Sequence, residues 1–416
     1  MTAAVELATR NIPVTVFEAA QTLGGRARRV VSHGANLDNG LHILIGAYSE
    51  TIRMIHRVRS TIQRQDLLRL PLHLQIEPAF RMRAWPLPAP LHIAAALFSA
   101  SGLSWTEKMA AVRFMLNQRS RNFRCKAGTT VATLLQQHSQ PRSVIEYLWH
   151  PICVSALNTN PDQAAAQVFL NVIRDSLAGP RAASDLLLPQ ADLSALFPEP
   201  AAELVRSHGG QVRLGETVTS LQACDKGFAV SATSTERFSH VIVAVAPHRL
   251  AQVVGHLPQL AAQLDLVRQF EYQPIYSVFL QYPQPVRLPA PMIGMRDSPA
   301  QWVFDRGALC NQPGMMGVVI SASGPHQGLS REELAQQVYR QLADQLSLPE
   351  PEWFQVIAEK RATFTCSPDL RRPANLTPVA GLLLAGDYTE SPYPATLEAA
   401  VRSGSQCARL VTDHHA

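Results

Sequence analysis

The chain has 416 residues, a length that favours two or three domains. Charged residues make up 17% of it and hydrophobic residues 46%, which excludes disordered, collagen-like and disulfide-scaffold proteins. No apolar run approaches the roughly 18 residues of a membrane span. The six cysteines lie far apart without a Cys-x-x-Cys pair, so we expect neither a zinc site nor a disulfide framework, and a reducing, cytosolic compartment.

The net charge is +5, and the positive charge is densest between Arg53 and Lys126. Such a segment suits an anionic membrane surface or nucleic acid. Because the sequence contains nothing like a helix-turn-helix, a zinc finger or an aromatic RNA platform, we expect no nucleic-acid partner.

The chain begins with a helix and a strand that together suggest nucleotide binding. Thr2 to Arg10 is predicted to be a helix without an N-terminal cap, and Ile12 to Phe17 a buried strand that ends at Glu18. A helix followed by a strand that ends in an acid is the second half of a βαβ dinucleotide-binding unit. In that unit the acid binds the ribose hydroxyls.

The phosphate-binding loop of such a unit lies about 20 residues before the acid, which is upstream of Met1. We therefore expect the in-frame DNA upstream to encode an apolar strand and a Gly-x-Gly-x-x-Gly-like loop of about 15 residues. On this expectation the 416-residue form is colourless or insoluble and the extended form yellow. A stop codon directly upstream, or stoichiometric cofactor binding by the short form, would contradict it.

Two further motifs follow the predicted strand. Gly24 and Gly25 let the backbone approach a pyrophosphate, and Arg26 beside them would neutralise it. The second motif is DNGLHILIGAY, from Asp38 to Tyr48. A lone histidine among apolar residues, such as its His42, is more often a core residue than a catalyst.

Later segments supply the remaining strands of the same nucleotide-binding sheet. They are residues 209–214 with Val218 beyond them, residues 240–245, and residues 382–385, which run into Gly386-Asp387 and a helix from about Thr396. The nucleotide-binding domain is therefore predicted to be discontinuous, with residues 1–59, 203–262 and 371–416. Residues 60–202 and 263–370 would form a second domain. It is predicted to contain strands at 275–280 and 316–320. It is also predicted to contain a helix that begins at Ser330, where Ser330 and Glu333 form an N-terminal capping box.

Taken together, these motifs resemble the FAD-dependent amine oxidase and phytoene desaturase superfamily over essentially the whole chain. The resemblance implies an α/β fold in which a Rossmann-like FAD-binding domain, N-terminally truncated here, is interleaved with an α+β substrate domain. It also implies FAD as cofactor and no metal. The implied FAD-binding residues are Glu18, Gly24, Gly25, Arg26, Gly40, Leu41, His42, Val218, Gly386, Asp387, Thr396 and Leu397. One departure is Ala399, where many members have a glycine.

A closer similarity is to one branch of the superfamily, the hydroxysqualene dehydroxylases. It is carried by residues 156–159, 167–177, 186–189, 364–373 and 387–389, which lie in both predicted domains. The resemblance implies that reduced FAD removes the hydroxyl of hydroxysqualene to give squalene, a precursor of hopanoids or sterols. It further implies a long-chain isoprenoid substrate and other squalene-pathway enzymes as partners.

Other functions stay open on the sequence. A carotenoid or phytoene-type desaturase would use the same cofactor in the opposite direction. An amine oxidase is disfavoured because only 6% of the residues are aromatic. A non-catalytic isoprenoid carrier on the same fold would have no use for Glu18, Arg26 and Asp387.

For the chemistry, the hydroxyl that leaves needs a proton donor, and we take His42 as the candidate acid, with Tyr48 second. A His42→Gln variant with full turnover would remove histidine from the mechanism.

Because a C30 hydrocarbon does not dissolve in water, we expect a peripheral protein on the inner face of the bacterial cytoplasmic membrane. The apolar, proline-rich segment from Trp85 to Phe98, flanked by Arg81, Arg83 and Arg113, is the candidate docking patch, with an ordinary buried helix as the alternative.

Overall fold

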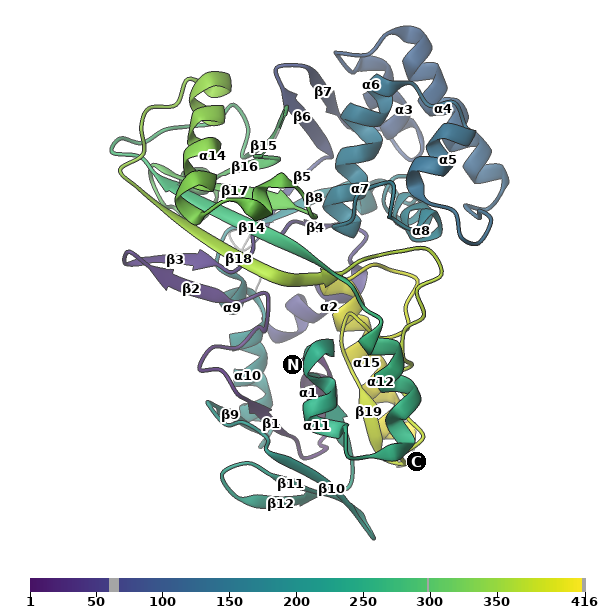
Figure 1. Ribbon diagram of the computed structural model, residues 1–416, viewed down its shortest axis with the longest axis vertical. Helices are drawn as coiled ribbons and strands as arrows, with labels where there is room; N and C mark the ends of the chain where they lie inside the picture. The colour runs from purple at the N-terminus through teal and green to yellow at the C-terminus, as the bar shows by residue number, and fades with distance from the viewer. Residues whose placement is uncertain (60–66, 298, 414–416) are drawn as a thin grey trace.

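A computed structural model describes residues 1–59, 67–297 and 299–413 (Figure 1). Two parallel strand pairs form the part predicted to bind a nucleotide. In one, β1 (Thr15–Glu18) pairs with β9 (Gln211–Leu214); in the other, β13 (Val241–Val243) pairs with β19 (Leu382–Leu384). All four predicted strands are present, but β1 begins at Thr15 and not at Ile12. The reason is that Pro13 has no N–H to donate and Asn11 takes a left-handed conformation with φ 60°.

Helices pack around these strand pairs, and glycine allows one close crossing. They are α1 (Thr2–Ala8), α2 (Ser49–Val58), α10 (Pro198–Ser207) and α15 (Leu397–Asp413). A Cβ on Gly404 of α15 would lie 3.0 Å from Cβ of Thr2, so the two helices touch through backbone. The predicted first helix ends at Ala8, two residues early, and as expected Met1 supplies no side-chain cap.

A buried carboxylate joins α1 to α2. Glu6 is 4% exposed, and its oxygens lie 2.6 Å from Arg53 Nη2, 3.1 Å from Arg57 Nη1 and 3.6 Å from Arg10 Nη2. Burial by itself would raise the pKa of Glu6, but the hydrogen bond from Arg53 and the charges of the arginines outweigh it and lower the pKa.

We expect the Glu6→Gln variant to lose about 1–2 kcal/mol of unfolding free energy at pH 7, because its side chain no longer carries the charge that pairs with the arginines. The loss is no larger because the arginines are partly exposed and water screens the interaction. A lowered carboxyl pKa contributes stability above the pKa of the unfolded chain, and that stability disappears as the pH falls through the folded-state pKa. The difference between wild type and variant in thermal melts should therefore shrink below about pH 4.5. Glu203→Gln, at an exposed position of α10, is the control. A pH-independent difference would contradict the assignment.

The larger sheet has seven strands in the order β18-β14-β17-β16-β15-β6-β7. Their bounds are β6 (His73–Glu77), β7 (Phe80–Arg83), β14 (Tyr272–Gln281), β15 (Met292–Met295), β16 (Trp302–Asp305), β17 (Met315–Ser321) and β18 (Trp353–Phe364). The predicted strands at 275–280 and 316–320 lie inside β14 and β17. Helix α14 (Arg331–Leu346) packs beside them, and Ser330 and Glu333 form the predicted capping box.

Helices α3 to α8 gather in one lobe beside this sheet (Figure 1). They are α3 (Leu91–Ser99), α4 (Trp105–Ser120), α5 (Val131–Gln137), α6 (Arg142–Val144), α7 (His150–Leu157) and α8 (Ala166–Ser176). Within the described ranges, no helix has the length and apolarity needed to cross a membrane.

Short elements complete the fold. Two antiparallel sheets consist of β2 (Arg29–Ser32) with β3 (Ala35–Asp38), and of β10 (Ser220–Cys224), β11 (Gly227–Ser231) and β12 (Thr235–Phe238). A third holds β4 (Leu44–Ile45), β5 (Leu67–Leu70) and β8 (Leu186–Pro189). The short helices are α9 (Leu193–Leu196), α11 (Leu250–Val254), α12 (Ala261–Arg268) and α13 (Arg306–Cys310).

The domain bounds given above stay a prediction. The sheet of β4, β5 and β8 joins a strand of the predicted nucleotide-binding part to two strands of the other part. The predicted boundary at residue 60 falls at the start of residues 60–66, which lie outside the described residues.

Candidate active site

Two of the predicted nucleotide-binding residues lie at one edge of the β1–β9 pair. Glu18 ends β1 opposite Leu214, and its carboxylate accepts a hydrogen bond from the Ala20 amide at 2.9 Å. Val218 follows β9 and packs in the same apolar cluster as Phe17. Nucleotides bind at the carboxyl ends of parallel strands, so this placement suits the predicted roles of both residues.

The Gly24-Gly25-Arg26 turn faces the end of the chain. Gly24 has φ 119°, and a Cβ there would lie 2.3 Å from the carbonyl oxygen of Ala27, so only glycine fits. Gly25 has φ 59° and open space where a Cβ would be. Arg26 Nη2 lies 2.6 Å from Asp387 Oδ1, and the charge of that carboxylate raises the arginine pKa further above its usual value.

A second guanidinium, which the sequence did not single out, lies on the other side of Asp387. Arg372 donates to the backbone oxygens of Asp387 at 3.4 Å, Tyr393 at 3.0 Å and Ser391. Its guanidinium carbon is 5.3 Å from the ring centroid of Phe364. Burial lowers the pKa of Arg372. Arg26 therefore pairs with the Asp387 carboxylate, while Arg372 holds the backbone from Asp387 to Tyr393.

The N-terminus of α15 forms the third part of the site. Thr396 Oγ1 accepts from the Ala399 amide at 3.2 Å and contacts the Tyr48 hydroxyl. Burial raises the pKa of Tyr48, so its hydroxyl stays protonated. Leu397 begins the helix, and Gly386 precedes it with φ 151°, where a Cβ would lie 2.6 Å from the Tyr388 ring.

The segments that carry the closer resemblance contact one another and the loop before α15. The Cys366 amide donates to Thr159 Oγ1 at 3.0 Å, and Asn158 Nδ2 donates to Thr363 Oγ1, directly before the 364–373 segment, at 3.0 Å. From α8, Asn171 Nδ2 donates to the carbonyl oxygen of Pro392 at 2.9 Å. These segments therefore surround the same region of the molecule.

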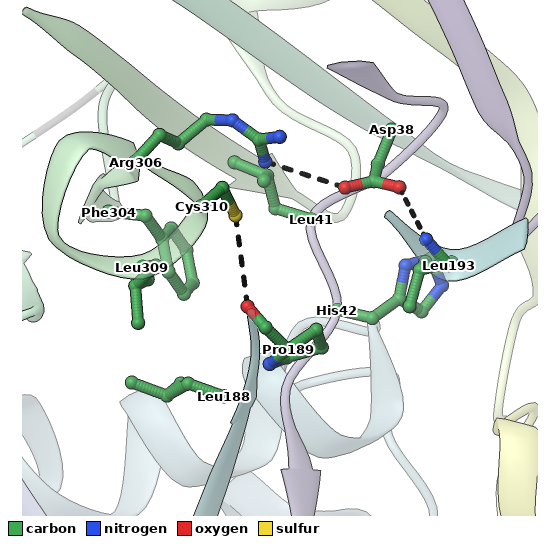
Figure 2. A pocket seen from close by; sticks show the side chains of 10 residues that line it. All are labelled: Asp38, Leu41, His42, Leu188, Pro189, Leu193, Phe304, Arg306, Leu309 and Cys310. Carbon is green, nitrogen blue, oxygen red and sulfur yellow. Dashed lines mark hydrogen bonds and ion pairs between the residues drawn. The ribbon is translucent and has the colours of Figure 1, made fainter. Parts of the chain in front are cut away.

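A small pocket lies where β3 and the segment after it, β8 and α9 meet β16 and α13 (Figure 2). One side is polar, with Asp38, His42 and Arg306; the other is apolar. Its ten lining residues are Asp38, Leu41, His42, Leu188, Pro189, Leu193, Phe304, Arg306, Leu309 and Cys310. The apolar members Leu188, Phe304 and Leu309 belong to the large hydrophobic cluster that continues into the helical lobe.

Asp38 is 5% exposed and is held by two groups from distant parts of the chain. The Leu193 amide donates to Oδ1 at 2.9 Å, and Arg306 Nη1 lies 3.4 Å from Oδ2 (Figure 2). Burial raises the pKa of Asp38, although the charge of Arg306 and the Leu193 amide oppose the rise. The direction of this shift favours the protonated form of Asp38, which is the form a proton donor uses.

His42 contacts the neighbouring backbone through one ring nitrogen. Its Nδ1 lies 2.6 Å from the carbonyl oxygen of Gly40, and burial lowers its pKa. The neutral ring then donates from Nδ1, which leaves Nε2 as an acceptor. This protonation state suits a residue that accepts a hydrogen bond better than one that donates a proton.

The predicted site residues thus form three groups. The first group lies at the β1–β9 edge and consists of Glu18 and Val218. The second lies around the N-terminus of α15 and consists of Arg26, Tyr48, Gly386, Asp387, Thr396 and Leu397. The third is at the pocket, which Leu41 and His42 line and where Gly40 contacts His42. The sequence missed Asp38 and Arg306. The available signals were the acid that opens DNGLHILIGAY and an arginine directly after a buried strand.

Comparison with known proteins identifies the class. The family model described as flavin containing amine oxidoreductase matches residues 1–412. The chain therefore belongs to the flavin-containing amine oxidoreductase family, and it is an FAD-dependent oxidoreductase.

Within that class, the chain is similar to particular enzymes. It is 26% identical to the hydroxysqualene dehydroxylase of Sinorhizobium fredii and 27% to that of Rhodopseudomonas palustris, over 99% of this chain and 95% of each relative. The 15-cis-phytoene desaturase of Solanum lycopersicum is 24% identical over 96% of this chain and 73% of its own length. The solved structure of an oxidoreductase from Methanosarcina mazei has a TM-score of 0.75 at 13% identity, covering 98% of this chain and 97% of the other.

The residues present fit FAD. The left-handed Gly24-Gly25 turn leaves room for a close approach, and the guanidinium of Arg26 beside it would contact a pyrophosphate. Glu18 would hold the adenosine ribose, Asp387 the ribityl chain, and the backbone amides at the start of α15 the electron-rich edge of the ring.

The pocket also depends on Gly46, because a Cβ there would lie 1.6 Å from the carbonyl oxygen of Ala182. Neither backbone can move without disrupting the β4–β8 pairing beside the pocket. We expect Gly46→Ala to cost about 3 kcal/mol or more of unfolding free energy, measured by chemical denaturation. Gly328→Ala, where nothing lies within 4 Å of the added Cβ, should be neutral and serves as control. Equal stability of the two variants would contradict the packing described here.

Proposed function

We propose that this protein reduces hydroxysqualene to squalene, with loss of water, as a step in hopanoid or sterol precursor supply. The observation that carries the proposal is the pocket, in which a buried acid and an apolar wall face the same space. Substrate dehydroxylation needs both features at once. The similarity to hydroxysqualene dehydroxylases over nearly the whole chain supports the same function.

The apolar wall accounts for binding of the hydrocarbon. Leu188, Phe304 and Leu309 line the pocket, so the part of the isoprenoid chain next to the hydroxyl would lie against side chains of matching polarity. Exclusion of water from this space would protect an allylic cation from capture.

The polar side accounts for loss of the hydroxyl. Bound FAD, when reduced, supplies the hydride that replaces the hydroxyl on carbon. Asp38 gives its proton to the departing oxygen, the C–O bond breaks, and water leaves. Arg306 and the Leu193 amide then stabilise the Asp38 carboxylate. His42 is placed to accept a hydrogen bond from the substrate hydroxyl through Nε2; its role as the acid, and that of Tyr48, stay predictions.

Two other functions agree less well with the site. A phytoene-type desaturase removes hydrogen and has no hydroxyl to protonate, so it would not need a buried acid that lines the pocket. A non-catalytic carrier would not need the Arg26–Asp387 pair or the second guanidinium of Arg372.

The substrate also suggests where the protein works. We infer a peripheral location on the inner face of the bacterial cytoplasmic membrane, where the hydrocarbon is available, with other squalene-pathway enzymes as partners. Trp85 and Phe98 of the predicted docking segment are 51% and 38% exposed, which agrees with this inference.

The test is a single-turnover reaction. The purified protein, reconstituted with FAD and reduced with dithionite under anaerobic conditions, is mixed with detergent-dispersed hydroxysqualene, and the products are separated by gas chromatography. We expect squalene, with one equivalent formed for each reduced FAD. A product with fewer hydrogens than the substrate, or unchanged hydroxysqualene, would overturn the proposal. Heat-denatured protein with free reduced FAD is the control.

A further inference from the structure

Helix α4 has an apolar stripe on its outer side as well as on its buried side. Ala110, Ala111 and Phe114 are buried against the lobe. On the opposite side, Trp105 is 63% and Leu116 is 62% exposed; between them Met109 is partly exposed, and Val112 is partly exposed while packing against the edge of the lobe's apolar cluster. Spacings of four, three and four residues put Trp105, Met109, Val112 and Leu116 in one row along the helix. A surface helix of a globular protein is normally polar there.

Neighbouring side chains extend this row into a surface. Phe98 at the end of α3 stacks on Trp105, with ring centroids 5.2 Å apart, and Lys108 Nζ donates to the Phe98 carbonyl at 2.9 Å. Trp85, 51% exposed, donates from Nε1 to Ser99 Oγ at 3.0 Å beside Phe98, and Leu91, 55% exposed, begins α3. Of the eight large hydrophobic side chains that are exposed in the described part of the chain, five lie between residues 85 and 116.

Positive charges predominate around the surface. Arg113 and Arg119 of α4 are exposed beside the apolar row, and Arg83 of β7 is exposed next to α3. Arg81 of β7 is exposed as well, but it pairs with Glu77 at 2.7 Å. Glu107 is the one acid in the sequence from Arg81 to Lys126. Its carboxylate accepts hydrogen bonds from Ser104 and Ser143 at the start of α4, so a single negative charge stands among several arginines.

We propose that α3 and the outer side of α4 dock on the surface of an anionic lipid bilayer. Tryptophans together with an apolar stripe flanked by arginines are the features with which a helix lies in the headgroup region. Docking here would place the substrate route at the bilayer, because Leu97 and Phe114 beneath this surface belong to the cluster that reaches the pocket. The link between docking and the substrate route rests on the proposed function, whereas the docking of this surface on a bilayer does not.

Vesicle flotation tests the proposal with phosphatidylcholine vesicles, with and without phosphatidylglycerol. We expect the wild-type protein to float with the anionic vesicles. The double variant Trp105→Glu/Leu116→Glu should partition at least about tenfold less, because two apolar side chains no longer enter the interface. Arg113→Glu/Arg119→Glu should lose binding to anionic vesicles, by about fivefold for each arginine. Val31→Glu, at an apolar position on β2 that is 67% exposed, is the matched control and should float like wild type.

The changed side chains are exposed, so circular dichroism should show all variants folded. Wild-type protein that stays with the soluble fraction, or equal flotation of wild type and Trp105→Glu/Leu116→Glu, would overturn the proposal. A dimer in light scattering that this double variant dissociates would assign the surface to a second copy of the chain instead. Turnover of detergent-dispersed hydroxysqualene without vesicle binding would refute the docking surface alone. Vesicle binding without turnover would refute the proposed function alone.

Discussion

In the Asp38→Asn variant we expect turnover of hydroxysqualene to fall by about 100- to 10,000-fold, the range typical of a lost general acid. Asparagine keeps an oxygen that can accept from the Leu193 amide, but it has no proton to give. FAD content and thermal stability should stay close to those of the wild type, which separates a chemical effect from a structural one. Single-turnover rates by rapid quench provide the measurement.

If Asp38 is the proton donor, the direction in which the turnover rate changes with pH follows. The acid acts when protonated, so the rate should fall as the pH rises through the Asp38 pKa. Because burial raises that pKa, the fall should occur at a higher pH than an ordinary aspartate would give. In Asp38→Asn this limb of the profile should be absent. Asp265→Asn, which changes an exposed carboxylate on α12, is the control and should leave the profile unchanged. An unchanged rate in Asp38→Asn would exclude Asp38 as the proton donor.

The Arg26→Ala variant should bind FAD about 100-fold more weakly than the wild type. The change removes a charge-assisted contact to the pyrophosphate and leaves Asp387, whose side chain is 8% exposed, without the cation at 2.6 Å. A tenfold change in affinity corresponds to about 1.4 kcal/mol, so the expected loss is about 3 kcal/mol. Flavin absorbance of the purified protein and fluorescence titration of the apoprotein measure it.

Arg268→Ala provides the control for this change, because Arg268 forms an exposed ion pair with Asp265 and lies outside the site. We expect its FAD affinity to match the wild type. Equal FAD content in Arg26→Ala and Arg268→Ala would show that Arg26 does not contact the cofactor. Loss of folding in Arg26→Ala would be recognised by circular dichroism, and Arg26→Lys, which keeps the charge, should then recover part of the FAD affinity.

Local sequence patterns were sufficient to predict several helices, strands and site residues of this protein. The α14 capping box depends on Ser330 and Glu333, which are three residues apart, so the helix start could be predicted from their spacing alone. The strand at residues 382–385 could be predicted because a short apolar run that ends at a glycine, here Gly386, is typical of a buried parallel strand. Glu18, Arg26 and Asp387 were each recognisable because their neighbours form known motifs.

Contacts between distant segments were decided by the tertiary structure alone. Arg26 and Asp387 are 361 positions apart, and no local pattern indicates that they form one ion pair. Asp38 becomes a candidate acid only because α9 and α13 bury it and supply its two partners. In the same way, α4 has two apolar stripes in its sequence, and only packing against the lobe decides which one remains exposed. Sequence periodicity records where side chains point along a helix, whereas burial and pKa depend on what the rest of the chain places beside them.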